Sequence, residues 1–428
     1  MISSPNKQKA RDFIWAAGIE DTFIPQVREG HRSLDEYELM AHYEHWRTDV
    51  GLCRELGLQA LRWGVPWYKV EPEEGRFDWR WTDEVIPYLV QELKIRPILD
   101  LVHYGCPGWL EKGFLNKSYP EKVAQFSAAF AERYKHLVSW YTPLNEPIVT
   151  ALMCGMRGLW PPYLKGEKGY IRIMLQLARG IQSTVRALKE VDPNSTMVYI
   201  EATGLTRTIR EDLASLAREE THRGYLCYDL FTGRLLPDHL LFSWLLRNGA
   251  SPDELIDLGR NKVDLDIIGM NFYPQWSTKQ IYLDKRGRIA FRDAEPEGDG
   301  FAELIRDYHN RYKVPIMITE TSAVGSEEIR LRWLQSSVGS IKNLRADGVP
   351  VIGYTWFPLF TMIDWRYRFG SEPRENYYLE LGLYRLNQED RQKWIATPLV
   401  EEFRKYIKSP EKAVGHLGAQ DASVTARS

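Results

Sequence analysis

The sequence has few cysteines, no marked excess of either charge and no long apolar run, and each shortage excludes a class of protein. Its four cysteines lie far apart and form no CxxC pair, which fits neither a zinc site nor a dense disulfide framework. Lys and Arg number 56 against 58 Asp and Glu, which gives a formal net charge of -2. Without a basic stripe or an acidic tail, nucleic acids and membranes are not expected partners.

The N-terminal region also lacks the features of a targeting or membrane segment. Residues 1–10 are polar, and the first apolar run, 13–19, is short and ends at Glu20 and Asp21. No apolar run reaches the roughly 18 residues of a membrane-spanning helix. We therefore expect a cytoplasmic protein.

What the sequence does have is a regular alternation of apolar, β-branched runs with amphipathic segments of helical period. Strands are expected eight times, at 13–19, 59–65, 96–102, 137–144, 196–201, 265–272, 314–320 and 350–357. Helices are expected between them, including 120–134, 170–191, 300–312 and 327–347. Eight apolar strands separated by helices predict a parallel α/β sheet closed into a single (β/α)8, or TIM, barrel. A doubly wound open sheet is the alternative, but Gly18-Ile19-Glu20 is not the glycine-rich turn that it requires.

The chain shows no linker or shift in composition that would divide it into domains. We expect one barrel over residues 1–408 and a flexible C-terminal tail over 409–428, which lacks periodicity. The longest loops are expected at 282–299 and 366–376, both polar and charged.

Two glutamates stand where the chemistry of such a barrel is found, at the carboxyl ends of strands. Glu146 follows the fourth strand in Asn145-Glu146-Pro147, and Glu320 ends the seventh in Ile318-Thr319-Glu320. Two carboxyl groups facing one another suit cleavage of a glycosidic bond, one as proton donor and one as nucleophile. For a retaining enzyme they should lie about 5 to 5.5 Å apart. The alternative interpretation is structural, with each glutamate paired to a barrel arginine such as Arg62.

These triplets resemble the acid/base and nucleophile motifs of clan A glycoside hydrolases, most closely family 1, the retaining β-glucosidases. The resemblance runs from about residue 13 to 387. It includes Phe13-Ile14-Trp15, the second-strand run 62–67 that begins with Arg62, His103-Tyr104, Asn271-Phe272-Tyr273, and Trp356 followed by Asp364-Trp365.

The resemblance implies a role for each matching residue. Glu320 would attack the anomeric carbon, and Glu146 would give and later take a proton. Because Glu320 is ionised beside it, Glu146 should have a raised pKa. The remaining roles concern the nucleophile and the sugar: Arg62 and Tyr273 would hold Glu320, Asn145 and His103 would bind ring hydroxyls, Trp356 would form the floor under the sugar, and Asp364 with Trp365 would clamp its distal side.

Departures from the family pattern concern the groups that bind the sugar. Near Phe23 the family has a Gln that grips two sugar hydroxyls, and here Glu20 and Asp21 are the nearby polar groups. The clamp Glu is a shorter Asp364. Reaction type is therefore better specified than sugar identity, linkage or oligomeric state.

Other residues suggest weaker hypotheses. Trp109, Trp160 and Trp276 are candidates for the aglycone entrance, but scaffold packing is the favoured explanation for each. The run Arg366, Arg368 and Arg374 would suit an anionic substrate, but interleaved glutamates favour a solvated loop. No metal-ligand spacing is present, and no metal or cofactor is expected.

The sequence thus predicts a hydrolase that cleaves small soluble β-linked glycosides with retention, through a glycosyl intermediate on Glu320. A sugar-binding barrel without turnover and a transglycosylase using the same intermediate remain as alternatives.

Overall fold

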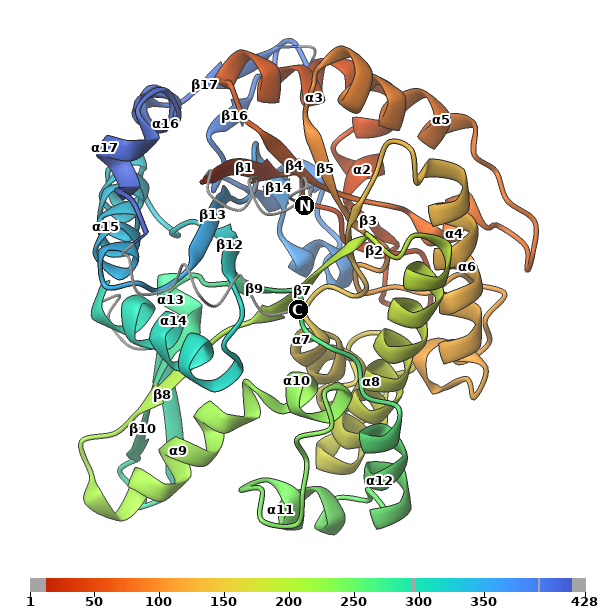
Figure 1. Ribbon diagram of the computed structural model, residues 1–428, viewed down its shortest axis with the longest axis vertical. Coiled ribbons are helices and arrows are strands. Elements are labelled where there is room, and N and C mark those ends of the chain that lie inside the picture. The colour runs from red at the N-terminus through yellow and green to blue at the C-terminus, as the bar shows by residue number, and fades with distance from the viewer. Residues whose placement is uncertain (1–12, 294–297, 392, 418–428) are drawn as a thin grey trace, which may run out of the picture.

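Eight parallel strands close into a barrel in the computed structural model, which describes residues 13–293, 298–391 and 393–417 (Figure 1). The first strand pairs with the last, Ile14 with Gly353, and also with the second, Ala16 with Ala60, so the sheet has no open edge. The predicted closed barrel is confirmed, and the open doubly wound sheet is excluded. The strands are β1 (Ile14–Gly18), β4 (Ala60–Gly64), β5 (Arg96–Asp100), β6 (Trp140–Thr142), β7 (Thr196–Ala202), β9 (Ile267–Asn271), β12 (Ile316–Thr321) and β13 (Val351–Trp356).

Amphipathic helices surround the barrel and cover the outer faces of the strands (Figure 1). In α8, Ile171, Leu175 and Ala178 are buried while Arg172 is exposed, as the helical period predicts. Gly180 lets α8 approach α6 closely, because an added Cβ would lie 2.5 Å from a ring carbon of Tyr119. The main covering helices are α3 (His42–Leu56), α5 (Arg80–Pro87), α6 (Tyr119–Tyr134), α8 (Gly166–Val191), α14 (Gly298–Tyr312), α15 (Glu327–Ala346) and α16 (Pro398–Lys408).

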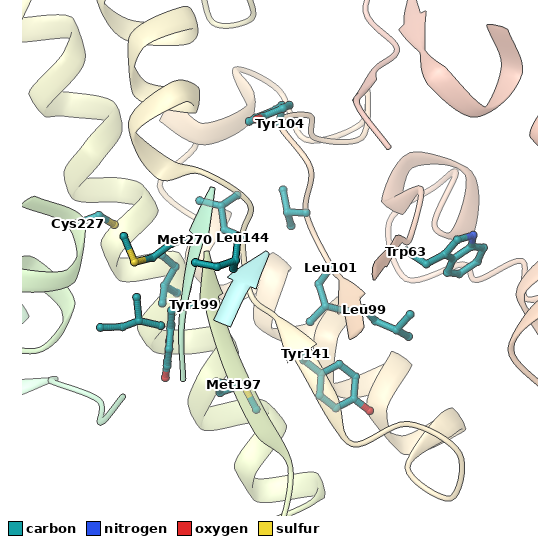
Figure 2. Close-up of a cluster of buried hydrophobic side chains, with 14 of the residues drawn as sticks. Trp63, Leu99, Leu101, Tyr104, Tyr141, Leu144, Met197, Tyr199, Cys227 and Met270 are labelled. Carbon is teal, nitrogen blue, oxygen red and sulfur yellow. The ribbon is translucent and has the colours of Figure 1, made fainter. Parts of the chain in front are cut away.

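The strands separate two apolar cores because successive side chains point to opposite faces. Figure 2 shows part of the outer core, where Trp63, Leu99 and Tyr141 belong to the large cluster between strands and helices. The inner core fills the barrel and consists of Ile14, Ala16, Ala60, Ile98, Val198, Ile200, Ile267 and Met317. Two residues beyond Ala60 and Ile98 come Arg62 and Asp100. Alternation therefore places these two charged side chains inside the barrel, at its carboxyl end.

Loops at the carboxyl ends of the strands carry small sheets of their own. The hairpin of β2 (Phe23–Ile24) and β3 (Leu34–Asp35) leads into the short helix α2 (Glu36–Leu39), which packs on β14 (Met362–Ile363). A three-stranded sheet of β8 (Leu205–Arg207), β10 (Thr278–Leu283) and β11 (Ile289–Asp293) projects from the barrel (Figure 1). The predicted loop at 282–299 is therefore wrong at 282–283 and 289–293, which are strand, and at 298–299, where α14 begins, whereas 284–288 form a turn. Residues 294–297 lie outside the described residues. The other predicted loop contains the 3₁₀ turns η5 (Trp365–Phe369) and η6 (Arg374–Tyr377).

The C-terminal end of the predicted barrel domain coincides with the end of α16 at Lys408. The segment predicted as a flexible tail begins differently, because Pro410–Val414 form helix α17 and Val414 is buried. Residues 418–428 lie outside the described residues, as do residues 1–12. Among the helices that the structure describes, none combines the length and the apolar character needed to cross a membrane.

Candidate active site

The two predicted glutamates are both buried at the carboxyl end of the barrel. Glu320 lies near the end of β12, where the pairing with β9 shifts register between Ile318 and Glu320. Such an irregularity redirects a side chain that would otherwise follow the strand alternation. Glu146 precedes helix α7 (Pro147–Ala151) and has a left-handed backbone, with φ 41°. For a residue with a side chain this conformation costs about 1 to 3 kcal/mol, and it is found most often at functional sites.

Glu320 is held by one cationic and one neutral donor. The Arg62 guanidinium donates through Nη1 to Oε1 of Glu320. The Tyr273 hydroxyl donates to the other oxygen, Oε2, at 2.6 Å. Both carboxylate oxygens are therefore fixed, and the ion pair with Arg62 suits an ionised side chain.

Glu146, by contrast, accepts hydrogen bonds only from neutral donors among the residues that the structure describes. The Tyr104 hydroxyl donates to Oε2, and Asn271 Nδ2 donates to Oε1 at 2.8 Å. Thr319 donates to the Asn271 amide oxygen at 2.7 Å, which fixes the orientation of that amide. Burial and, second, the charge of Glu320 raise the pKa of Glu146 to about 7. The sequence argument identified the charge but not burial, the larger cause.

The two carboxyl groups share their surroundings. Asn271 and Tyr273, two residues apart at the end of β9, bind Glu146 and Glu320 respectively. Arg62 donates both to Glu320 and, at 2.7 Å, to Asn145, the neighbour of Glu146. Residues from four strand ends thus bring the two carboxyl groups to one site inside the barrel mouth.

A second buried charge network lies beside Arg62. His103 Nδ1 lies 2.8 Å from Asp21 Oδ1 and 3.4 Å from Asp100 Oδ2, and Arg62 Nη2 donates to Asp100. Although burial alone would lower it, Asp21 and Asp100 raise the pKa of His103 well above its usual value. Burial raises the pKa of Asp21 to about 7 despite the nearby His103. His103 Nε2 lies 3.0 Å from Asn145 Nδ2, so this network reaches the residue beside Glu146.

Asp21, Asp100 and His103 also have ligand atoms within 4.8 Å of one another, the spacing of a metal site. Arg62 donates to Asp100 at the same place, so a guanidinium already supplies positive charge there. This donor set is better explained as a hydrogen-bonded charge network than as a metal centre.

Three of the remaining predicted sugar contacts, Glu20, Trp365 and Trp356, are buried or packed in different ways. Glu20 is buried, and its pKa is raised by burial and, among its neighbours, by Glu320. Trp365 packs on Tyr104 with ring centroids 5.3 Å apart, and its indole N–H is buried without a hydrogen-bond partner in the described residues. Trp356 is wholly buried and donates its N–H to Leu381 O at 3.0 Å, and its role as the floor under the sugar stays a prediction.

Asp364 differs from the clamp that the sequence predicts. Its Oδ1 accepts from the Arg366 backbone at 2.8 Å, and its Oδ2 accepts from Arg366 Nε at 2.9 Å. The carboxylate thus caps η5 and pairs with Arg366. Close by, Glu36 accepts from Ile363 N at 3.0 Å, which brings a buried carboxylate to the strand that precedes Asp364.

The structure also shows the contacts of the arginine run and of the three tryptophans that the sequence singled out. Arg368 is buried and donates to Ile24 O and to the Tyr163 hydroxyl, so it braces loops, and Arg374 donates to Leu39 O and Glu375. Nothing in these contacts supports a site for an anionic substrate. The three tryptophans differ: Trp160 packs on Tyr104 and Trp365, Trp109 donates to Glu71 O, and Trp276 is 46% exposed beside Tyr273.

Sequence reasoning missed several site residues. Asp100 was detectable, because strand alternation two residues after Ile98 predicts an inward side chain. Tyr104 and Asn271 stood within recognised motifs but had no assigned role. Glu36 carried no signal, because only the packing of α2 on β14 brings it near the site.

A closed (β/α)8 barrel with two buried carboxyl groups at its carboxyl end, one bound by arginine and one by neutral donors, defines the class of glycoside hydrolases. Comparison with known proteins identifies the family within that class. The model for glycosyl hydrolase family 1 matches residues 16–234, about half of the chain. The chain therefore belongs to glycosyl hydrolase family 1 and is a glycoside hydrolase.

Similar proteins agree with this assignment. The 1,4-beta-D-glucan glucohydrolase of Thermotoga neapolitana is 20% identical over 362 residues, 76% of this chain and 82% of the relative. The aryl-phospho-beta-D-glucosidase BglC of Bacillus subtilis is 21% identical, over 76% and 78% of the two chains. The family 1 β-glucosidase structure from Thermotoga maritima superposes with a TM-score of 0.78 at 19% identity, covering 92% of this chain and 97% of the other. At that identity the superposition shows the shared fold.

Proposed function

We propose that this protein hydrolyses β-linked glycosides with retention of configuration, with Glu320 as nucleophile and Glu146 as acid/base. The observation that carries the proposal is the different binding of the two carboxyl groups at one site. A group tied to a guanidinium is suited to attack as a carboxylate, whereas a buried group with a pKa near 7 is suited to exchange protons.

The first step would form a bond between a Glu320 oxygen and the anomeric carbon as the glycosidic bond breaks. Glu146 would give its proton to the departing oxygen, which leaves as an alcohol. In the second step Glu146 would take a proton from water, the water oxygen would bond to the anomeric carbon, and Glu320 would depart as a carboxylate. These two steps require the carboxyl groups to lie about 5 to 5.5 Å apart, and this separation stays a prediction.

Hydrogen-bond donors around the two glutamates would keep both carboxyl groups in place between the two steps. Arg62 and Tyr273 restrict the rotation of Glu320, and Tyr104 and Asn271 restrict that of Glu146. We further propose that Asn145, His103, Trp365 and the face of Trp356 contact the sugar. Small soluble glycosides of the kind named for the relatives are the expected substrates, and a cytoplasmic location stays a prediction.

A slow 2-fluoro β-glucoside tests the assignment of the nucleophile. Peptide mass mapping should find the sugar on Glu320, and the E320Q variant should remain unlabelled. A label on Glu146 or elsewhere would contradict the proposed roles.

Failure to cleave every aryl and natural β-glycoside tested would contradict the proposal. A transglycosylase uses the same intermediate and would transfer the sugar to an added alcohol in preference to water.

A further inference from the structure

Two buried glutamates outside the cleavage machinery, Glu20 and Glu36, lie beside one another at the edge of the proposed sugar site. The β2–β3 hairpin brings them together, because the Glu36 backbone N–H donates to Thr22 O at 3.1 Å, two residues from Glu20. Glu20 lies near Glu320, whose charge acts on it. Glu36 lies near Glu20, Asp35 and Asp364, whose charges act on it.

Each of these glutamates has one oxygen occupied and one left over. Glu20 Oε1 accepts from Thr22 N at 3.2 Å and from the Thr22 hydroxyl at 2.6 Å, and no described residue donates to Oε2. Glu36 Oε2 accepts from Ile363 N at 3.0 Å. Its Oε1 has no hydrogen-bond partner in the described part of the chain, and Glu36 is only 1% exposed, so this oxygen is buried and unsatisfied.

The nearby cations are already committed to other carboxylates. Arg62 is paired with Glu320 and Asp100, and His103 with Asp21 and Asp100. Arg366 pairs with Asp364. Within the described residues, no Lys, Arg or His forms an ion pair with Glu20 or Glu36.

The charges of His103 and, less strongly, Arg62 lower the pKa of Glu20, but neither residue forms an ion pair with it. Two adjacent buried carboxylates that no cation contacts directly are unfavourable. Burial and their mutual repulsion raise the pKa of Glu36 well above its usual value, and burial raises that of Glu20. A positive group supplied by the substrate would relieve the repulsion and satisfy both free oxygens. A neutral hydroxyl would supply hydrogen bonds but no charge.

We propose that the sugar cleaved by this enzyme carries an ammonium group at ring carbon 3 or 4, bound between Glu20 Oε2 and Glu36 Oε1. The substrate class is therefore an amino-sugar β-glycoside. This inference rests on the proposed function, since it places the anomeric carbon at Glu320 and the opposite side of the ring at the two glutamates. An ammonium has three N–H donors, enough for both free oxygens and one further contact.

The test compares aryl β-glucosides that differ only in one substituent, measured at about pH 6 so that the amine is protonated. The 3-amino or 4-amino compound should have a kcat/KM at least about tenfold above that of the parent glucoside, as expected for a buried charge pair. The 2-amino compound carries the same charge beside the reacting carbon and should not gain.

Variants then assign the effect to the two glutamates. E20Q and E36Q should each lower the ratio of amino to parent kcat/KM by at least about tenfold. Because the ratio is measured within one protein preparation, a loss of folded protein does not change it. E38Q is the matched control, since Glu38 lies on the same helix but is exposed and pairs with Lys69, and its ratio should stay the same.

The outcomes separate the two proposals. If the parent glucoside is cleaved and Glu320 is labelled but no amino compound is preferred, the amino-sugar inference is wrong and the proposed function stands. An unchanged ratio in both E20Q and E36Q would also overturn the inference. If no compound is cleaved and Glu320 is not labelled, the proposed function fails first.

Discussion

Removing the Tyr104 hydroxyl should move the pH dependence of this enzyme in a defined direction. The hydroxyl donates to Glu146 Oε2 and lowers the pKa of that carboxyl, against burial and Glu320, which together bring it to about 7. A hydrogen bond to a charged group contributes about 1.5 to 3 kcal/mol, and 1.36 kcal/mol corresponds to one pKa unit. Because a hydroxyl can also accept a hydrogen bond from the protonated acid, the lower end applies, and removing it should raise the pKa of Glu146 by about one unit.

In the Y104F variant the basic limb of kcat/KM against pH should therefore move upward by about one pH unit. The sign follows because Glu146 must be protonated to act as the acid, and a higher pKa keeps it protonated to higher pH. The assay is hydrolysis of an aryl β-glucoside from about pH 5 to 9, at substrate concentrations below KM. Y134F is the control, because the Tyr134 hydroxyl bonds to Thr82 and Asp83 on the outer helices and to neither of the two catalytic carboxyl groups. A basic limb that stays in place or moves downward in Y104F would refute the reasoning.

Three further changes test other parts of the structure. In E146A, kcat/KM should fall by about 100-fold or more for a glycoside with a poor leaving group and much less for an activated aryl glycoside, and equal losses would argue against the acid role. R62K should lower the single-turnover rate about 100-fold, because a lysine cannot contact Glu320, Asp100 and Asn145 together. R96K is the control, because the Arg96 guanidinium packs on Trp140 outside the site, and this variant should keep the wild-type rate. An equal loss in R96K would contradict the role assigned to Arg62. I98A should lower the free energy of unfolding by about 2 to 5 kcal/mol in denaturant titrations, against about 0.5 kcal/mol or less for I256A on the surface; similar effects of the two would contradict the inner core.

The barrel was predictable from the sequence because its strands are apolar on both faces. Each of the eight expected runs coincides with a strand of the barrel to within a few residues, and the outer and inner cores explain why Leu99 and Ile98 are both apolar. The sheet of β8, β10 and β11 was not predictable in the same way. On β11, Ile289 and Phe291 are about half exposed, so the strand lacks the burial that makes apolar runs distinctive.

The predicted site residues differ in how far local sequence determined their positions. Glu146 and Glu320 follow strands directly, so the end of each strand fixes their place in the barrel. Glu36 depends on a hydrogen bond to Ile363, 327 residues away, and no local pattern encodes that contact. Asp364 was assigned by its neighbour Trp365, but Arg366, two residues along, engages its carboxylate.

The wide spacing of the site along the chain has a consequence for fragments of this protein. Arg62 and Glu320 are 258 residues apart, and Asn271 and Glu146 are 125 residues apart. A polypeptide that stops near residue 234 would carry the proposed proton donor without the nucleophile, and the complementary piece would carry the reverse. Only reassociation of the halves would restore turnover, so during refolding the onset of hydrolysis would time the docking of the last strands against the first.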